Sequence, residues 1–125
     1  MISELEKMEA LLPVLVREAD RWQSMRINCS QPVVDRLWIQ WSSYRVFLHV
    51  IHPLDSGEAL FCPQPWPAVM RVVRGKCEVG MGSGPGHEPP PISSRVLLRE
   101  GCVFEMLHPD LWHYLLPVNG PAHVV

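Results

Sequence analysis

The sequence predicts one mostly β domain, a sandwich or barrel of short strands preceded by an N-terminal helical arm. The chain has 125 residues, of which 47% are hydrophobic, and this suits a single core better than two domains. It also holds 13 prolines and eight glycines. Proline at about twice its average usage breaks a chain into short elements. We therefore expect about eight short strands joined by turns rather than long helices.

The helical signal is confined to residues 3–24, where apolar side chains recur at three- and four-residue steps. These side chains are Leu5, Met8, Leu11, Leu12, Leu15, Val16, Ala19 and Trp22. Ser3 and Glu6 have the spacing of a capping box. Pro13 predicts either a kink or the start of a second helix, because proline lacks the N–H that a helix interior uses. We assign residues 1–30 to an amphipathic arm that lies across the barrel or a partner subunit.

The remaining residues, 31–125, form the predicted barrel, because the apolar period changes there to two. A turn at Ser42 and Ser43 joins the first two strands, and residues 74–76 form a tight turn that pairs the next two. Residues 82–91 read as an exposed loop. The expected strands are 33–41, 44–51, 69–73, 77–81, 96–99, 102–107, 112–116 and 122–125.

One segment, residues 62–82, resembles the first sequence motif of the cupin superfamily. Counting back from Gly75 by the family's spacing places Cys62 and Gln64 where the motif has its two histidines. Ala68 stands at the position of the motif's glutamate. The resemblance implies a small RmlC-like barrel, a double-stranded β-helix, in which the three metal ligands of this motif are replaced.

The second cupin motif has a looser counterpart between Gly101 and Asn119. Pro109 and His113 match the motif in type, whereas Leu111 stands where a glycine is expected. The resemblance therefore covers about residues 33–125 and retains His113 as a family metal ligand. It is more specific for fold than for chemistry.

A local pattern also marks the first motif as a pocket wall. Three prolines alternate between residues 63 and 67, so Cys62, Gln64 and Trp66 face the opposite side of an extended segment. Prolines do not donate to a ladder, so this segment is an edge strand or a barrel rim. The predicted ligand-binding residues are Cys62, Gln64, Trp66, Met70 and His113.

His113 is the candidate catalytic residue. It stands between Trp112 and Tyr114 in a predicted strand, so its side chain points opposite to theirs. If it faces the interior, its near-neutral pKa makes it a candidate general acid or base, with Glu105 or Asp110 as an orienting carboxylate. The alternative is a histidine that fills the lumen and bonds a backbone group.

Two further histidines and two arginines lie in predicted strands. His49 and His52 are three residues apart, so at most one of them points into a barrel. Arg45 and Arg71 stand mid-strand among apolar residues, and an inward arginine would indicate a carboxylate ligand.

The predicted function is binding of a small organic molecule in the barrel lumen without the usual cupin metal. We expect no cofactor. A divalent metal, if one binds, would use Cys62, His113 and His108. Three alternatives stay open: a metal-dependent cupin dioxygenase or isomerase, a metal-free isomerase or epimerase that uses His113, and a non-catalytic interaction module. Whether the protein is an enzyme is left open.

Composition narrows the expected partners and location. Eleven basic and 13 acidic residues give a net charge of −2 with no basic stripe, which argues against nucleic acid. No apolar stretch reaches the roughly 18 residues of a membrane span. The four cysteines form no Cys-x-x-Cys pair and follow an acidic N-terminus, which favours reduced thiols in the cytoplasm. The cupin resemblance implies a homodimer.

Overall fold

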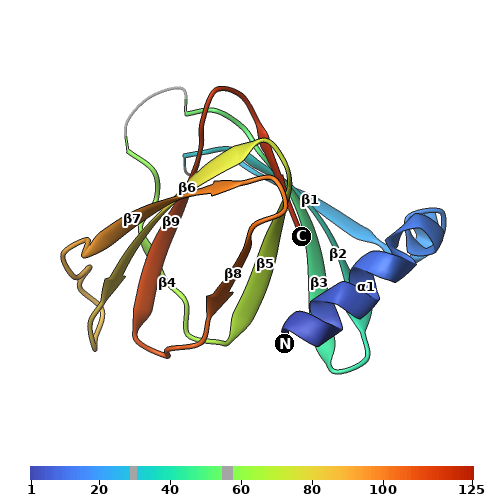
Figure 1. Cartoon of the computed structure of the whole chain (residues 1–125), viewed down its shortest axis with the longest axis horizontal. Coiled ribbons are helices and arrows are strands. Elements are labelled where there is room, and N and C mark those ends of the chain that lie inside the picture. The colour runs from blue at the N-terminus through green and yellow to red at the C-terminus, as the bar shows by residue number, and fades with distance from the viewer. Residues whose placement is uncertain (29–30, 55–57) are drawn as a thin grey trace.

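The computed structural model describes residues 1–28, 31–54 and 58–125. Within these residues one helix and one short 3-10 turn precede the strands, and Figure 1 labels α1 and the strands β1 to β9. The elements are α1 (Ile2–Leu15), η1 (Ala19–Arg21), β1 (Gln23–Ile27), β2 (Val34–Trp41), β3 (Tyr44–Ile51), β4 (Cys62–Pro63), β5 (Ala68–Arg74), β6 (Lys76–Ser83), β7 (Ser94–Arg99), β8 (Val103–Met106), β9 (Leu111–Pro117) and β10 (Ala122–Val124).

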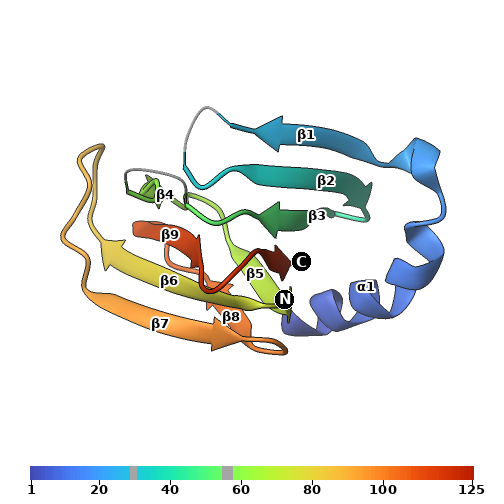
Figure 2. The same ribbon diagram turned by 90° about the horizontal axis from the view of Figure 1, so that it is seen from above.

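The strands form two antiparallel sheets. One has six strands in the order β1-β2-β3-β10-β5-β8, and the other has four in the order β4-β9-β6-β7. Figure 2 shows β1, β2 and β3 on one side and β6, β7 and β9 on the other. The predicted mostly β class is confirmed. Within the described residues, strand pairing does not close the sheets into a barrel, so the expected closed barrel is not found.

Helix α1 covers the outer face of the six-stranded sheet of its own chain. Its buried residues Leu5, Met8 and Leu15 pack with Ile39, Val46 and Val125. The helix runs through Pro13 and ends at Leu15, so no second helix starts at the proline. The capping box does not form, because the helix starts with Met1 as its N-cap and has no side-chain cap hydrogen bond.

The end of the predicted helical arm is a strand. Residues 23–27 form β1, which pairs with β2 from Gln23 opposite Trp38 to Ile27 opposite Val34. Just before this strand, the Trp22 indole N–H donates to the carbonyl oxygen of Leu15, the last residue of α1, at 2.8 Å. Pairing with an available sheet edge therefore outweighs the local helical period.

The β2–β3 hairpin forms as predicted, with Ser42 at φ 55° in its turn. The predicted pairing of 69–73 with 77–81 is wrong, because β5 and β6 belong to different sheets. Gly75, at φ +85°, makes the corner between them, and a Cβ there would lie 2.6 Å from the Pro121 carbonyl oxygen. Each of the two strands has one strongly apolar face. Placing the strands in different sheets sets these faces against each other and buries both.

The main core lies between the sheets. It consists of Ile51, Met70, Val72, Cys77, Val79, Leu98, Met106, Ala122 and Val124. Because side chains alternate along a strand, β2 and β3 send Ile39 and Val46 towards α1 and place Arg36 and His49 on the inner face. No helix in the described part of the chain is long and apolar enough to cross a membrane.

Candidate functional site

A cavity of about 840 Å³ runs from between the two sheets towards the N-terminal end of α1. All five residues that the sequence predicts as ligand contacts line it, namely Cys62, Gln64, Trp66, Met70 and His113. On the opposite wall, β2 and β3 contribute Arg36, Phe47 and His49. The two sheets thus bring residues far apart in the sequence to one space.

His113 lies on the wall formed by the four-stranded sheet. It is directly opposite Cys62 of β4 and Met81 of β6 in the strand register. Its Nδ1 is buried and has no hydrogen-bond partner among the described residues. Burial lowers the pKa of His113, so the ring is neutral at physiological pH. The neutral ring lines the cavity, while its Nδ1 is enclosed by protein atoms.

Of the other predicted ligand contacts near this wall, Cys62 and Gln64 are held by hydrogen bonds, but their surroundings do not make them reactive. The Cys62 sulfur lies 3.9 Å from the carbonyl oxygen of His113, and burial raises the pKa of the Cys62 thiol. A protonated thiol is a poor nucleophile, so Cys62 acts as a small lining group. The Gln64 amide donates to the Trp66 carbonyl at 3.0 Å. Trp66 itself is 68% exposed and marks the rim, whereas Met70 is buried on β5 of the opposite sheet.

Neither carboxylate that the sequence suggested orients His113. Glu105 is exposed and lies opposite Val69 in the β5–β8 register, on the outer face. The backbone N–H of Asp110 donates to Nδ1 of His108 within their own turn. His113 therefore has no hydrogen-bonded carboxylate within the described residues, which a proton-relay pair would require.

The residues named for a conditional metal site do not come together. Cys62 and His113 are cross-strand neighbours, but His108 is exposed in the turn before β9. Across the described ranges, no three His, Cys, Asp or Glu side chains form a group that could hold a metal ion. The described cysteines Cys62, Cys77 and Cys102 are free thiols.

Sequence reasoning missed the polar pair on the opposite wall. Arg36 and His49 face each other in the β2–β3 register, and Arg36 Nε donates to His49 Nε2 at 2.9 Å. The His49 ring stacks on Phe47 with centroids 5.6 Å apart and planes 17° apart. Burial, assisted by the Arg36 charge, lowers the pKa of His49 to about 4. Once the hairpin was assigned, counting residues from its turn would have paired Arg36 with His49. The spacing did not indicate which face of the hairpin points into the cavity.

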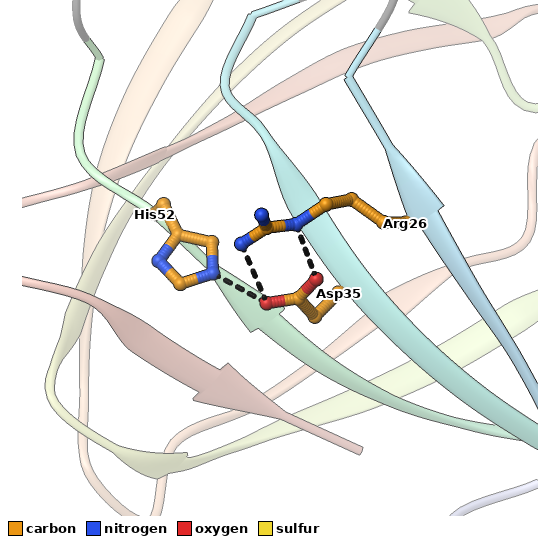
Figure 3. A network of polar contacts seen from close by, with 3 residues as sticks. All are labelled: Arg26, Asp35 and His52. Atoms are coloured by element: carbon orange, nitrogen blue, oxygen red, sulfur yellow. Dashed lines mark hydrogen bonds and ion pairs between the residues drawn. The ribbon is translucent and has the colours of Figure 1, made fainter.

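His52, the other histidine of this segment, lies on the outer face. Figure 3 shows it with Asp35 and Arg26, and its Nε2 is 2.7 Å from an Asp35 carboxylate oxygen. Arg26 Nε lies 2.8 Å from the other oxygen. The hydrogen bond from Arg26 lowers the pKa of Asp35 most, and the hydrogen bond from His52 lowers it further. This network borders a second cavity of about 740 Å³ on the face away from the candidate site.

The two arginines that the sequence singled out also lie away from the cavity interior. Arg71 points outward and forms an ion pair with Glu9 of α1, at 2.8 Å. Arg45 is exposed at the rim, where its guanidinium sits 5.1 Å from the centre of the Trp38 ring. The inward arginine is Arg36.

Comparison with known proteins leaves the family open. No protein-family model matches the chain, and no curated protein matches it. Among solved structures, it is similar to a protein of unknown function, DUF1255, from Acinetobacter sp. ADP1. The TM-score is 0.57 at 17% identity, over 84% of this chain and 92% of that one. This likeness shows the fold alone.

Proposed function

We propose that this protein binds a small organic molecule in the cavity between its sheets, without the metal ion usual in cupins. The supporting observation is the cavity of about 840 Å³, which has polar groups on both walls and an apolar interior. A concave, mostly apolar space with a few convergent polar groups is the usual form of a small-molecule site. His113 and Arg36 are among the polar residues that line it, one from each sheet.

We also propose that the two sheets are a cupin-like barrel with a depleted metal site. The proposal is supported by the β4–β9 pair, in which Cys62 from the first motif stands opposite His113 from the second. Gln64 lines the same cavity, and so does Ala68, which has no ligand atom. These positions offer only one imidazole and one protonated thiol as metal ligands. An organic ligand is therefore favoured over a bound metal ion.

A cavity-filling substitution tests this proposal. Ala68 lines the cavity, whereas Ala10 is exposed on α1, so Ala68→Phe and Ala10→Phe add the same ring in different places. A fragment library is screened by ligand-observed NMR against the wild type and both variants. We expect at least one saturable fragment whose affinity falls about tenfold or more in Ala68→Phe and is unchanged in Ala10→Phe.

Two results would contradict the proposal. One is a wild type that binds no fragment, and the other is a folded Ala68→Phe variant that binds as the wild type does. Thermal unfolding of both variants shows whether each is folded under the conditions of the screen.

A metal-free isomerase is the second candidate, and the neutral imidazole of His113 in the cavity wall favours it. In that case His113→Gln would still bind ligand but would lose turnover. Against it stands Tyr114, whose hydroxyl is used on the outer face, where it donates to Glu78 at 3.1 Å. Because no carboxylate or tyrosine among the described residues bonds His113, binding is the better supported function.

We further propose a homodimer. The outer face of the six-stranded sheet beside α1 exposes Leu37 and Val73, which line the second cavity. Exposed apolar side chains gathered in one groove are typical of an interface. Because α1 packs on its own sheet, the face next to it is the part left for a partner. Sedimentation equilibrium measures the oligomeric state directly.

A further inference from the structure

Arg36 is a half-buried cation that faces the proposed binding cavity. It is the third residue of β2, on the face that also carries Val34, and Val34 packs against the core between the sheets. Burial lowers the pKa of Arg36. A guanidinium nevertheless stays charged at neutral pH, so its positive charge persists inside the cavity.

The contacts of Arg36 leave that charge unbalanced. Its Nε donates to neutral His49, and its Cζ lies 5.0 Å from the centre of the Phe47 ring. A histidine whose pKa is about 4 offers a lone pair but no negative charge. Among the described residues, Arg36 forms no ion pair with a carboxylate. Its two terminal nitrogens have no hydrogen bond in the described part of the chain.

Other arginines of the same chain show the contrast. Arg21, Arg26 and Arg71 each pair with a carboxylate at 2.7 to 2.8 Å. Of these, the side chains of Arg21 and Arg26 are 50% and 60% exposed to solvent, where a cation needs a partner least. Arg36 is partly withdrawn from water, where an unpaired charge costs more. Arg36 is thus a half-buried cation that has no carboxylate partner among the described residues.

The described lining of the cavity does not supply the missing charge. Its carboxylate is Glu4, at the helix end, which pairs with Lys7 at 3.2 Å. A second cation, Arg45, lines the rim. The lining also includes the apolar core residues Ile51, Met70 and Met106. The cavity therefore combines a positive charge with an apolar interior.

We propose that Arg36 binds the carboxylate of a small, partly apolar organic acid in this cavity. His49 and Phe47 hold the guanidinium by one nitrogen and one face, which leaves the edge with the two terminal nitrogens for the ligand. This planar edge matches two carboxylate oxygens and favours a bidentate contact. The inference rests on the proposed function and adds to it the chemical class of the ligand.

Matched acid and amide pairs test the inference. Acetate with acetamide, benzoate with benzamide, and phenylacetate with phenylacetamide are titrated at pH 7.5 into the whole protein. Binding is followed by NMR, including the Arg36 Nε–Hε signal, and inorganic phosphate is titrated alongside. We expect at least one acid to bind about 10- to 100-fold more tightly than its amide and more tightly than phosphate. That acid should shift the Hε signal.

Three variants assign the effect. Arg36→Gln removes the charge, Arg36→Lys keeps the charge without the planar edge, and Arg99→Gln removes an exposed arginine at the end of β7. The preference for the acid should disappear in Arg36→Gln, weaken in Arg36→Lys and persist in Arg99→Gln. If Arg36→Gln does not fold, Arg36→Lys and the Hε signal of the wild type carry the test.

The outcomes separate this inference from the proposed function. Equal binding of acids and amides in the wild type, or an acid preference that survives in folded Arg36→Gln, overturns the role of Arg36 while leaving the cavity a binding site. Tighter binding of phosphate than of every acid overturns the carboxylate assignment. A wild type that binds neither acids, amides nor library fragments overturns both proposals.

Discussion

His49 should make the stability of this protein depend on pH in mildly acidic solution. The fold lowers the pKa of His49 from 6.5 to about 4, chiefly through burial. Between these two values the unfolded chain binds a proton at His49 and the folded chain does not. Because the unfolded state then holds more protons, stability is complete above pH 6.5 and is lost as the pH falls towards 4.

The magnitude follows from the size of the shift. Each pKa unit corresponds to about 1.4 kcal/mol, so the full shift is about 3 kcal/mol, of which about 2 kcal/mol is lost by pH 5. For a domain with a free energy of unfolding of about 5 to 15 kcal/mol, this is a substantial fraction. The His49→Gln variant removes the titrating group, and its amide oxygen can still accept the hydrogen bond from Arg36.

The assay is urea unfolding at pH 7.5 and pH 5.0, followed by the fluorescence of the five tryptophans. The quantity of interest is the difference in unfolding free energy between wild type and His49→Gln at each pH. The shift of His113 acts in the same direction but is present in both proteins, so it cancels. Relative to His49→Gln, we expect the wild type to lose about 2 kcal/mol of unfolding free energy between pH 7.5 and pH 5.0.

A difference that is the same at both pH values would refute the reasoning. An NMR titration in which the His49 ring signals change near pH 6.5 would refute it as well, since it would mean that the folded chain leaves this ring in contact with water.

Two further predictions concern packing. Met8, which is 1% exposed where α1 meets the sheet, should cost about 2 to 5 kcal/mol of unfolding free energy when changed to Ala, whereas Leu11→Ala, at an exposed site on the same helix, should cost under about 0.5 kcal/mol. Equal losses in urea unfolding would mean that α1 does not dock as described. A Cβ at Gly80 would lie 1.9 Å from the Tyr114 ring, so Gly80→Ala should cost about 1 to 3 kcal/mol. The same change in a Tyr114→Ala background should cost far less in a double-mutant cycle, and full additivity would exclude this contact as the cause.

Local geometry made several features of the site predictable. Alternation along an extended chain depends only on neighbouring residues, so it correctly set His113 opposite to Trp112 and Tyr114. The alternating prolines likewise predicted an edge segment, and β4 lies at the edge of the four-stranded sheet. The turn at Ser42 and the mostly β class follow from the same kind of local pattern.

The sequence by itself therefore determined which side chains share a strand face and where the chain turns. Only the tertiary structure decided that β5 and β6 enter different sheets, and that 23–27 leaves the helical pattern to pair with β2. It also decided that Arg36 and His49 point inward, opposite His113. The physical reason is that a period of two defines two faces without saying which one is buried. That choice depends on apolar contacts between segments far apart in the chain.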